Sequence, residues 1–408
     1  MSDFQKLWVG QAVSVFGSLI TRTALPWCAL LYLHAHAMDM ALLVLADLLP
    51  GFLLGLSAGA WLDRRSKRPV MLLCDLLRFL LVVSIPALAL TGKLTLGYLF
   101  CVAPLMGALS TVFDIAYQSY LPELVESEAL GKANSRLSAS AAVAEVCAFS
   151  VSGWLVQHFG GPQALLIDAA TFLLSALSLV LIKTPHRTLP PSGYPAKRGW
   201  WGQGVGIFRE ATDGLRYVAQ HRILRALALA QTALSFCGAL IGPLYMLFVT
   251  RTLALEPKIL GMVFAVGGVT SLLGATLAEP LARRVGLHRA TVLGFLTIPL
   301  GMLAIPLAPA RSVWGYVALA TNQLLTDPGW TIFEVHQTTL RQQLAPEALL
   351  GRINAVTRVG GLGASLIGTL LAGVLGDRAG PRPVLFAGAG LALVAAVLFA
   401  RQLSTACG

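Results

Sequence analysis

Apolar residues occur along the chain in long segments, which short polar connections separate from one another. An α-helix needs about 20 residues to cross the hydrocarbon core of a bilayer, and the segments are close to that length or longer. The first exceeds the 7–15 apolar residues of a signal peptide and contains Arg22, so we interpret it as a retained span. We predict twelve spans, at residues 7–33, 40–62, 69–90, 95–120, 132–157, 162–182, 223–250, 259–281, 290–307, 313–339, 349–375 and 383–403.

The composition favours the same class of protein. Hydrophobic residues make up 56% of the 408 residues and charged residues only 12%, whereas about 25% of a soluble domain is charged. So few charges cannot cover a globule of this size, which excludes an ordinary soluble enzyme, a disordered chain and a coiled coil. The sequence therefore predicts an all-α membrane protein.

The cysteines give no sign of a metal site. All six occur singly, without a C-x-x-C pair, and no cluster of histidines is present. This distribution is typical of small packing residues and not of a zinc site or a disulfide framework. We expect no metal and no cofactor.

The net charge of +11 indicates an orientation in the membrane. Twelve spans leave both termini on one side, and 20 of the 30 Lys and Arg residues fall in segments on that side, against six on the other. Basic residues favour the cytoplasmic side. We therefore expect cytoplasmic termini in a bacterial inner (plasma) membrane, with the positive charge near lipid headgroups and not on nucleic acid.

A polar stretch from Lys183 to Arg225 divides the chain. We predict an N-terminal six-helix bundle (1–183), a cytoplasmic linker (184–222) and a C-terminal six-helix bundle (223–408). The end of the linker favours an amphipathic helix on the inner membrane surface, and an ordinary linker helix without membrane contact is the alternative. Its apolar face holds Ile207, Phe208, Ala211, Leu215, Val218 and Ala219.

An internal repeat relates the two predicted bundles. Residues 129–134 (ALGKAN) match residues 349–354 (LLGRIN) at an offset of 220, and the same offset carries Gly160 onto Gly380. One offset that matches at several places indicates duplication of a six-helix unit. A parallel repeat of this kind predicts two bundles related by a pseudo-two-fold axis along the membrane normal, with substrate bound between them and a rocking motion during transport.

The connection after the second span carries a family signature. Residues 59–68 (GAWLDRRSKR) resemble the G-x-L-a-D-r-x-g-r-k loop of the major facilitator superfamily, with Trp61 and Ser66 in place of the usual leucine and glycine. Residues 340–343 (LRQQ) and 350–355 (LGRINA) are similar to the segment before span 11 in the branch that holds enterobactin exporters and macrolide or drug:proton antiporters.

The resemblance covers nearly the whole chain and implies a proton-coupled secondary exporter that works by alternating access. It also implies that Gly59, Asp63, Arg64 and Arg68 form a gating signature. The Asp63 carboxylate can pair with a basic residue or lie at a helix N-terminus, and a contact made in only one state would bias the rocking equilibrium. A solvated loop charge is the alternative.

Ionisable residues inside the predicted spans are candidates for coupling, because a charge in the bilayer is costly. We favour Arg22 with Asp47 or Glu145, since a carboxyl that moves between an arginine and an apolar environment exchanges a proton. A static buried pair is the alternative, and Asp75 and Arg78 in one span are expected to form such a pair. The candidates are Arg22, Asp47, Asp114, Glu145, Asp327, Glu334 and Arg358.

Other polar and aromatic residues in the spans are candidates for lining a substrate cavity, although each one taken singly is more typical of packing or of the membrane interface. They are Trp27, Tyr117, Gln118, Gln231, Phe236, Tyr245, Asn322, Gln323, Trp330 and His336.

The favoured function is export of an amphipathic small molecule, such as a drug or a siderophore, by a monomer. Lipid or lysophospholipid transport, nutrient uptake and a non-transporting sensor are the alternatives, although a sensor would normally need an output domain. No H-E-x-x-H, G-x-S-x-G or G-x-x-x-x-G-K-S/T pattern occurs, which argues against an enzyme and an ATP-driven pump.

Overall fold

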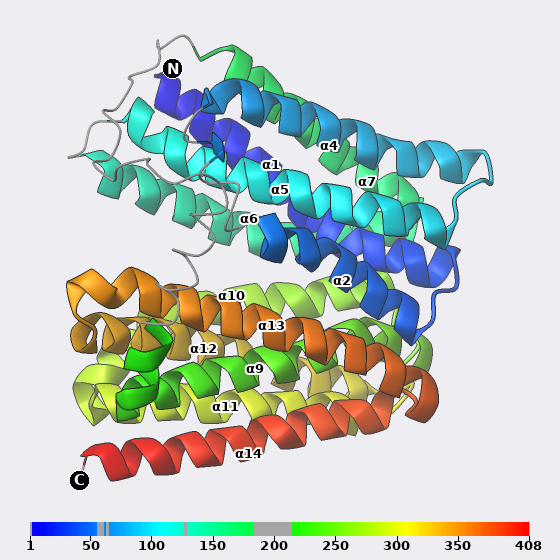
Figure 1. Ribbon diagram of the computed structural model, residues 1–408. Coiled ribbons are helices and arrows are strands. Elements are labelled where there is room, and N and C mark those ends of the chain that lie inside the picture. Colours follow the sequence, from blue (N-terminus) through cyan, green and yellow to red (C-terminus); the bar gives the residue numbers. More distant parts are fainter. Residues whose placement is uncertain (1, 55–60, 63–64, 126–128, 183–213, 408) are drawn as a thin grey trace. The chain divides into compact units, whose positions relative to one another are not determined.

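The computed structural model describes residues 2–54, 61–62, 65–125, 129–182 and 214–407, in which all regular structure is helical (Figure 1). Eleven helices within these ranges are long and apolar enough to cross a membrane. They correspond to eleven predicted spans, and the predicted tenth span is α12 (Val313–Leu344), a 32-residue helix with several polar residues. The prediction of an all-α membrane protein is confirmed.

The chain divides into two compact units. The first unit comprises Met1–Pro190 and Val249–Gly268, and the second unit comprises Pro191–Phe248 and Val269–Gly408. The helix α10 (Pro257–Val285) contributes residues to both.

Helix α1 is central to the packing of the first unit. It contacts α6 and α7, while α4 contacts α5 and α7, and α2 contacts α5. The helices of this unit, besides the first part of α10, are α1 (Asp3–Trp27), η1 (Cys28–Tyr32), α2 (Ala37–Leu54), α4 (Lys67–Leu90), α5 (Leu96–Leu124), α6 (Leu130–Phe159) and α7 (Gly161–Val180).

The second unit repeats this packing order. Helix α9 contacts α13 and α14, as α1 contacts α6 and α7, and α11 contacts α12 and α14, as α4 contacts α5 and α7. Besides α12 and the second part of α10, its helices are α9 (Arg222–Leu247), α11 (Leu287–Leu307), α13 (Glu347–Ala379) and α14 (Pro381–Cys407).

Irregular features of the backbone repeat at the offset of 220 that the sequence shows. The π-helix η1 (Cys28–Tyr32) recurs as η3 (Phe248–Thr252). His34 and Ala254 follow them with φ angles of 56° and 54°, which are uncommon for residues other than glycine. The backbone N–H of Ala35 bonds to Ala29 as that of Leu255 bonds to Val249. Such matched departures from regular structure support the predicted duplication.

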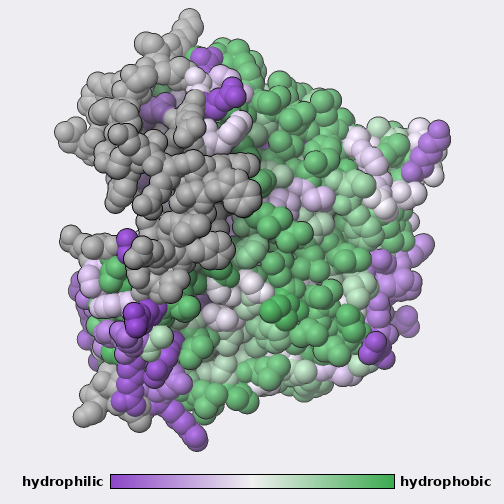
Figure 2. Space-filling model, in the orientation of Figure 1, coloured by the Kyte–Doolittle hydropathy of each residue, from purple (hydrophilic) through white to green (hydrophobic). Residues whose placement is uncertain are grey.

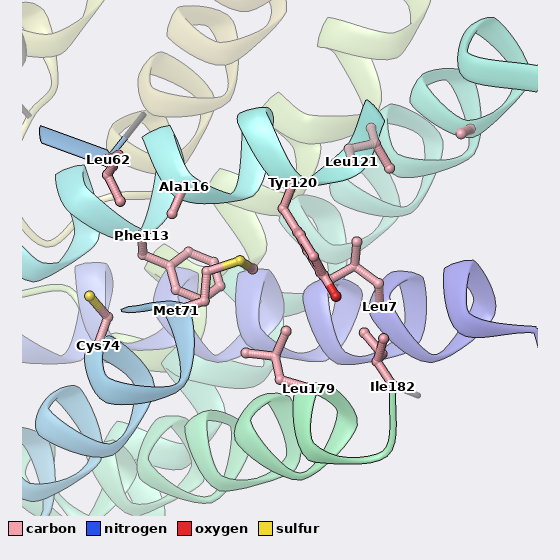
Figure 3. Close-up of a cluster of buried hydrophobic side chains, with 11 residues drawn as sticks. Leu7, Leu62, Met71, Cys74, Phe113, Ala116, Tyr120, Leu121, Leu179 and Ile182 are labelled. Carbon is pink, nitrogen blue, oxygen red and sulfur yellow. The ribbon is translucent and has the colours of Figure 1, made fainter. Parts of the chain in front are cut away.

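A buried apolar cluster joins α1, α4, α5, α6 and α7 of the first unit (Figure 3). Leu7 of α1, Met71 of α4, Phe113 of α5 and Leu179 of α7 are all at most 2% exposed. Outside the core, many large apolar side chains are exposed along the helices, among them Leu80, and Figure 2 shows them as broad apolar areas with polar residues gathered near helix ends. Apolar sides of this kind suit contact with lipid.

The helices extend beyond most predicted spans, since apolar residues mark the hydrocarbon core while a helix continues through the polar interface. The span predicted at residues 95–120 ends too early, because its helix α5 continues to Leu124. Pro122 is tolerated there because a proline near a helix end removes one hydrogen bond without interrupting a long helix.

The predicted amphipathic linker helix lies partly outside the described residues. Ile207, Phe208 and Ala211 fall there, while residues 214–220 are helical. Val218 is 4% exposed and packs with Leu224 and neighbouring apolar residues of the second unit. The described end of this helix therefore packs partly on the protein.

Gly17 provides a test of the packing between α1 and α7. A Cβ at this position would overlap the Thr171 side chain and lie 2.6 Å from Asp168 Oδ1. Gly17→Ala should therefore lower the free energy of unfolding by about 1–3 kcal/mol. Thermal unfolding in detergent measures the loss, and Gly238→Ala, where the Cβ meets no atom within 4 Å, is the control. An equal effect of the two changes would show that α1 and α7 are not in close contact here.

Candidate functional site

A cavity of about 260 Å³ opens between α1, α5 and α6 of the first unit. The α6 residues on its wall include Asn134, Leu137, Ser138 and Ala141, which are spaced by three or four positions and so share one helix face. Tyr117 is the contribution of α5. The lining residues are Gln11, Ala12, Val15, Tyr117, Asn134, Leu137, Ser138, Ser140 and Ala141.

Two polar atoms of this cavity have no partner within the described part of the chain. They are Gln11 Oε1 and the Tyr117 hydroxyl, both of which are buried. A buried polar atom without a hydrogen bond is costly. The remaining wall combines the apolar Ala12, Val15, Leu137 and Ala141 with the polar Asn134, Ser138 and Ser140. The cavity therefore suits a molecule that is mostly apolar and offers hydrogen-bonding groups. Of the cavity candidates from the sequence, only Tyr117 is among its lining residues.

The favoured coupling residues lie on three helices of the first unit. Arg22 of α1, Asp47 of α2 and Glu145 of α6 are all exposed. Arg22 is close enough to act electrostatically on Asp47. Within the described ranges, however, no basic nitrogen lies within 4.0 Å of the Asp47 or Glu145 carboxylate.

The other candidates of this unit differ in burial. Asp114 of α5 is exposed and acts electrostatically on Tyr117, three residues later. Gln118 is also exposed. Trp27 is 1% exposed and lies within the helix packing.

The structure adds a buried charged cluster that the sequence had indicated only in part. The ion pair predicted between Asp75 and Arg78 is confirmed, with Arg78 Nη2 at 2.5 Å from Asp75 Oδ1. The Arg78 guanidinium carbon lies 4.2 Å from the ring centre of Phe113 and 4.6 Å from that of Phe172. Asp168 of α7 is fully buried and lies within electrostatic reach of both residues. Sequence analysis missed this addition because Asp168 lies 90 positions away from Arg78.

In the second unit Gln337 joins two candidates from different helices. Its amide nitrogen donates to Gln231 Oε1 of α9 at 2.7 Å and to Glu334 Oε2 at 2.5 Å. Gln337 is 1% exposed, and Arg341, one turn later, is within electrostatic reach of Glu334. Helical spacing from Glu334 could have indicated Gln337, but its partner on α9 could not be foreseen.

The remaining candidates of the second unit lie apart from this chain of hydrogen bonds. Asn322 and Gln323 are buried; Asn322 donates to Thr326 at 3.0 Å. Asp327 acts electrostatically on Tyr245. His336 is buried against the Ala278 carbonyl, Phe236 is half-buried, and Trp330 and Arg358 are exposed.

Of the predicted gating signature only Arg68 can be placed, since Gly59, Asp63 and Arg64 lie outside the described residues. Arg68 donates to the carbonyl oxygens of Leu179 at 2.8 Å and Val180 at 2.9 Å. These are terminal carbonyls of α7, which a basic side chain stabilises. Arg68 thereby holds the first turn of α4 to the end of α7.

A metal site finds no support in the described ranges, where no group of three His, Cys, Asp or Glu residues could hold an ion.

Comparisons with known proteins agree on one family. A model of the Major Facilitator Superfamily matches residues 7–369. The multidrug efflux pump Tap of Mycolicibacterium fortuitum is 28% identical over 386 residues, which cover 89% of this chain and 87% of Tap. An MFS-type transporter of Bacillus subtilis, YvqJ, is 24% identical over 287 residues, which cover 70% of this chain and 66% of that protein.

Solved structures show the same fold. A bacterial homologue of the iron transporter ferroportin, in an inward-facing state, aligns with a TM-score of 0.76 and 20% identity over 98% of both chains. The nucleoside transporter NupG aligns with a TM-score of 0.76 and 12% identity over 98% of this chain and 99% of its own. At such low identity these likenesses concern the fold alone.

Gln337 provides a test of the polar chain in the second unit. Gln337→Leu should lower the free energy of unfolding by about 1–3 kcal/mol, because it leaves the Gln231 and Glu334 oxygens without their donor. Thermal unfolding measures the change. Thr339→Ala is the control on the same helix, since the Thr339 hydroxyl bonds only to the backbone of Val335 in its own helix. Equal stability of the two variants would contradict a role for Gln337 in holding α12 to α9.

Proposed function

The chain belongs to the major facilitator superfamily, and we propose that it is a secondary exporter that moves an amphipathic small molecule, such as a drug, out of the cell in exchange for protons. Family membership makes it an integral membrane transporter and not an enzyme. The direction, the class of substrate and the coupling ion are the proposed parts.

The cavity between α1, α5 and α6 is the observation that carries the proposal. The apolar part of its wall would bury the body of an amphipathic molecule, and Gln11 Oε1 and the Tyr117 hydroxyl would bind its polar group. Export of drugs is supported by the similarity to Tap, a multidrug efflux pump, over most of both chains. A siderophore, which is also partly polar, stays within the proposed class.

Proton coupling is supported by carboxyl groups inside the spans, since such residues in transporters commonly serve proton relays. Asp47 with Arg22 is one candidate pair among the exposed residues, because the two are in electrostatic reach. Glu145, Asp114, Asp327, Glu334 and Arg358 stay as further candidates.

The remaining parts of the proposal concern topology. We place both termini in the cytoplasm and the protein in a bacterial inner membrane, because of the distribution of basic residues. Two six-helix bundles, residues 1–183 and 223–408, would alternate access as a monomer. Residues 184–222 would link them on the cytoplasmic side, close to lipid headgroups.

A transport assay tests coupling. Proteoliposomes with an acidic lumen should accumulate a fluorescent amphipathic cation such as ethidium, because protons that leave the lumen drive the exchange. A protonophore together with collapse of the membrane potential should abolish the accumulation, and protein-free liposomes are the control. Transport that continues undiminished after both gradients are collapsed, and that needs ATP, would overturn proton coupling. Movement of a fluorescent lysophospholipid instead of ethidium would favour a lipid transporter.

Tyr117 tests the cavity. Tyr117→Phe removes a hydroxyl that has no partner in the described part of the chain, so stability should not fall. The lost hydrogen bond to substrate should weaken binding by about 1 kcal/mol, roughly fivefold in Kd.

Ser119→Ala is the matched control for Tyr117→Phe, because the Ser119 hydroxyl donates to the backbone oxygen of Ile115 in the same helix. Binding is measured by fluorescence titration with the same cation. An unchanged Kd for Tyr117→Phe would place the binding site elsewhere.

A further inference from the structure

The buried charges of the first unit do not balance. Asp75 and Asp168 are 0% exposed and Arg78 is 4% exposed. Arg78 is paired with Asp75 at 2.5 Å, and both residues act electrostatically on Asp168. One guanidinium therefore faces two buried carboxyl groups.

Two ionised carboxylates beside one guanidinium would leave a net negative charge in the apolar interior. An uncompensated charge of this kind costs several kcal/mol, and ionisable groups within a membrane are normally paired. Asp75 has the ion pair, so Asp168 is the group that a proton would neutralise. Among the described residues, the surrounding groups include no second cation; they are the Thr21 hydroxyl of α1, the Cys74 thiol of α4, the Asp114 carboxyl of α5 and the Ser175 hydroxyl of α7.

The hydrogen bonds of Asp168 point to the same assignment. Thr171 Oγ1 lies 2.8 Å from the backbone oxygen of Asp168 and 3.1 Å from its Oδ1. A threonine hydroxyl has one hydrogen to donate. If this hydrogen serves the shorter contact, a hydrogen on the carboxyl group itself would satisfy the contact to Oδ1. The other oxygen, Oδ2, is buried and meets no donor in hydrogen-bond geometry among the described residues, with the Thr21 hydroxyl as the polar group near the carboxyl. A neutral carbonyl oxygen tolerates this better than a carboxylate.

We propose that Asp75, Arg78 and Asp168 form a proton-binding site, with the proton held by Asp168 Oδ1, and that this proton is the one exchanged during transport. The second part rests on the proposed proton-coupled export. Release would transfer the proton to water and change the net charge of the cluster from zero to minus one, with Arg78 then shared by the carboxylates of Asp75 and Asp168.

Helix α5 connects this site to the substrate cavity. The Phe113 ring covers the Arg78 guanidinium at 4.2 Å and stacks on the Tyr117 ring at 6.4 Å between ring centres. Tyr117 lines the cavity. Asp114, between these two rings in sequence, is exposed and acts electrostatically on Arg78. Substrate that binds against Tyr117 can thereby shift Phe113 and the position of Arg78 between its two carboxyl partners.

Infrared spectroscopy tests whether the cluster holds a proton, without a transport measurement. A protonated buried carboxyl group gives a carbonyl-stretch band that a carboxylate lacks. The purified wild-type protein should show this band, and both Asp168→Asn and Asp75→Asn should lose it, because one carboxylate then balances Arg78. The exposed Glu279→Gln, on α10, should keep it. Absence of the band in the wild type, or its survival in both variants, would overturn the proton site.

Transport then tests the role of the proton. Asp168→Asn keeps the Asp75–Arg78 pair and a side chain of the same shape, so the variant should fold with wild-type thermal stability and exchange substrate at equal pH. It should lose the accumulation driven by a pH step, which is about tenfold per pH unit for one proton. Glu279→Gln should keep that accumulation.

The outcomes separate the two proposals. Full pH-driven accumulation by Asp168→Asn would remove the cluster from coupling even if the infrared band is lost. A wild-type protein that shows the band but no pH-driven transport would contradict proton-coupled export and leave the proton site standing. If Asp168→Asn proves unstable, the infrared and transport measurements are made on Asp75→Asn instead, because this variant also leaves one carboxyl group for Arg78.

Discussion

The absence of water in the bilayer core is the constraint on which this structure depends, because each backbone or side-chain polar group must find its partner within the protein. Helices meet that demand for the backbone, and they account for all regular structure in the described ranges. Where the first helix of each repeat ends, a π-helix and a tight turn supply internal hydrogen bonds, as between Ala35 and Ala29 and between Leu255 and Val249. Both the helices and these internal hydrogen bonds recur in the two repeats.

Side chains obey the same constraint in three ways. Arg78 pairs with Asp75 between two aromatic rings, so that its charge is neutralised and its flat faces are covered. Gln337 satisfies two oxygens from different residues. The oxygens at Gln11 and Tyr117 border a cavity and have no partner in the part of the protein that the structure describes. Unsatisfied groups beside an open space mark a place for a ligand, whereas satisfied groups hold helices together.

The proposed substrate site and the proposed proton site use neighbouring positions of one helix. On α5, Phe113 covers Arg78 and Asp114 acts on Arg78 electrostatically. Tyr117, on the same helix, lines the cavity. A short helical segment of this kind couples two sites without a long pathway, since a small displacement of α5 changes both environments. The proposed exchange of substrate for protons thus has a local physical basis in the first unit.

The sequence by itself determined the helical membrane fold, its twelve apolar or partly polar helices, the duplication and the local pair of Asp75 and Arg78. These features depend on residues close in sequence or on a constant offset, and hydrophobic length and helical spacing are enough to specify them. Tertiary structure alone decided that Asp168 joins Arg78, that Gln337 joins Gln231, and that Trp27 is buried while Tyr117 borders a cavity. These outcomes depend on which helix faces pack together, and residues 90 or more positions apart meet only when the helices associate.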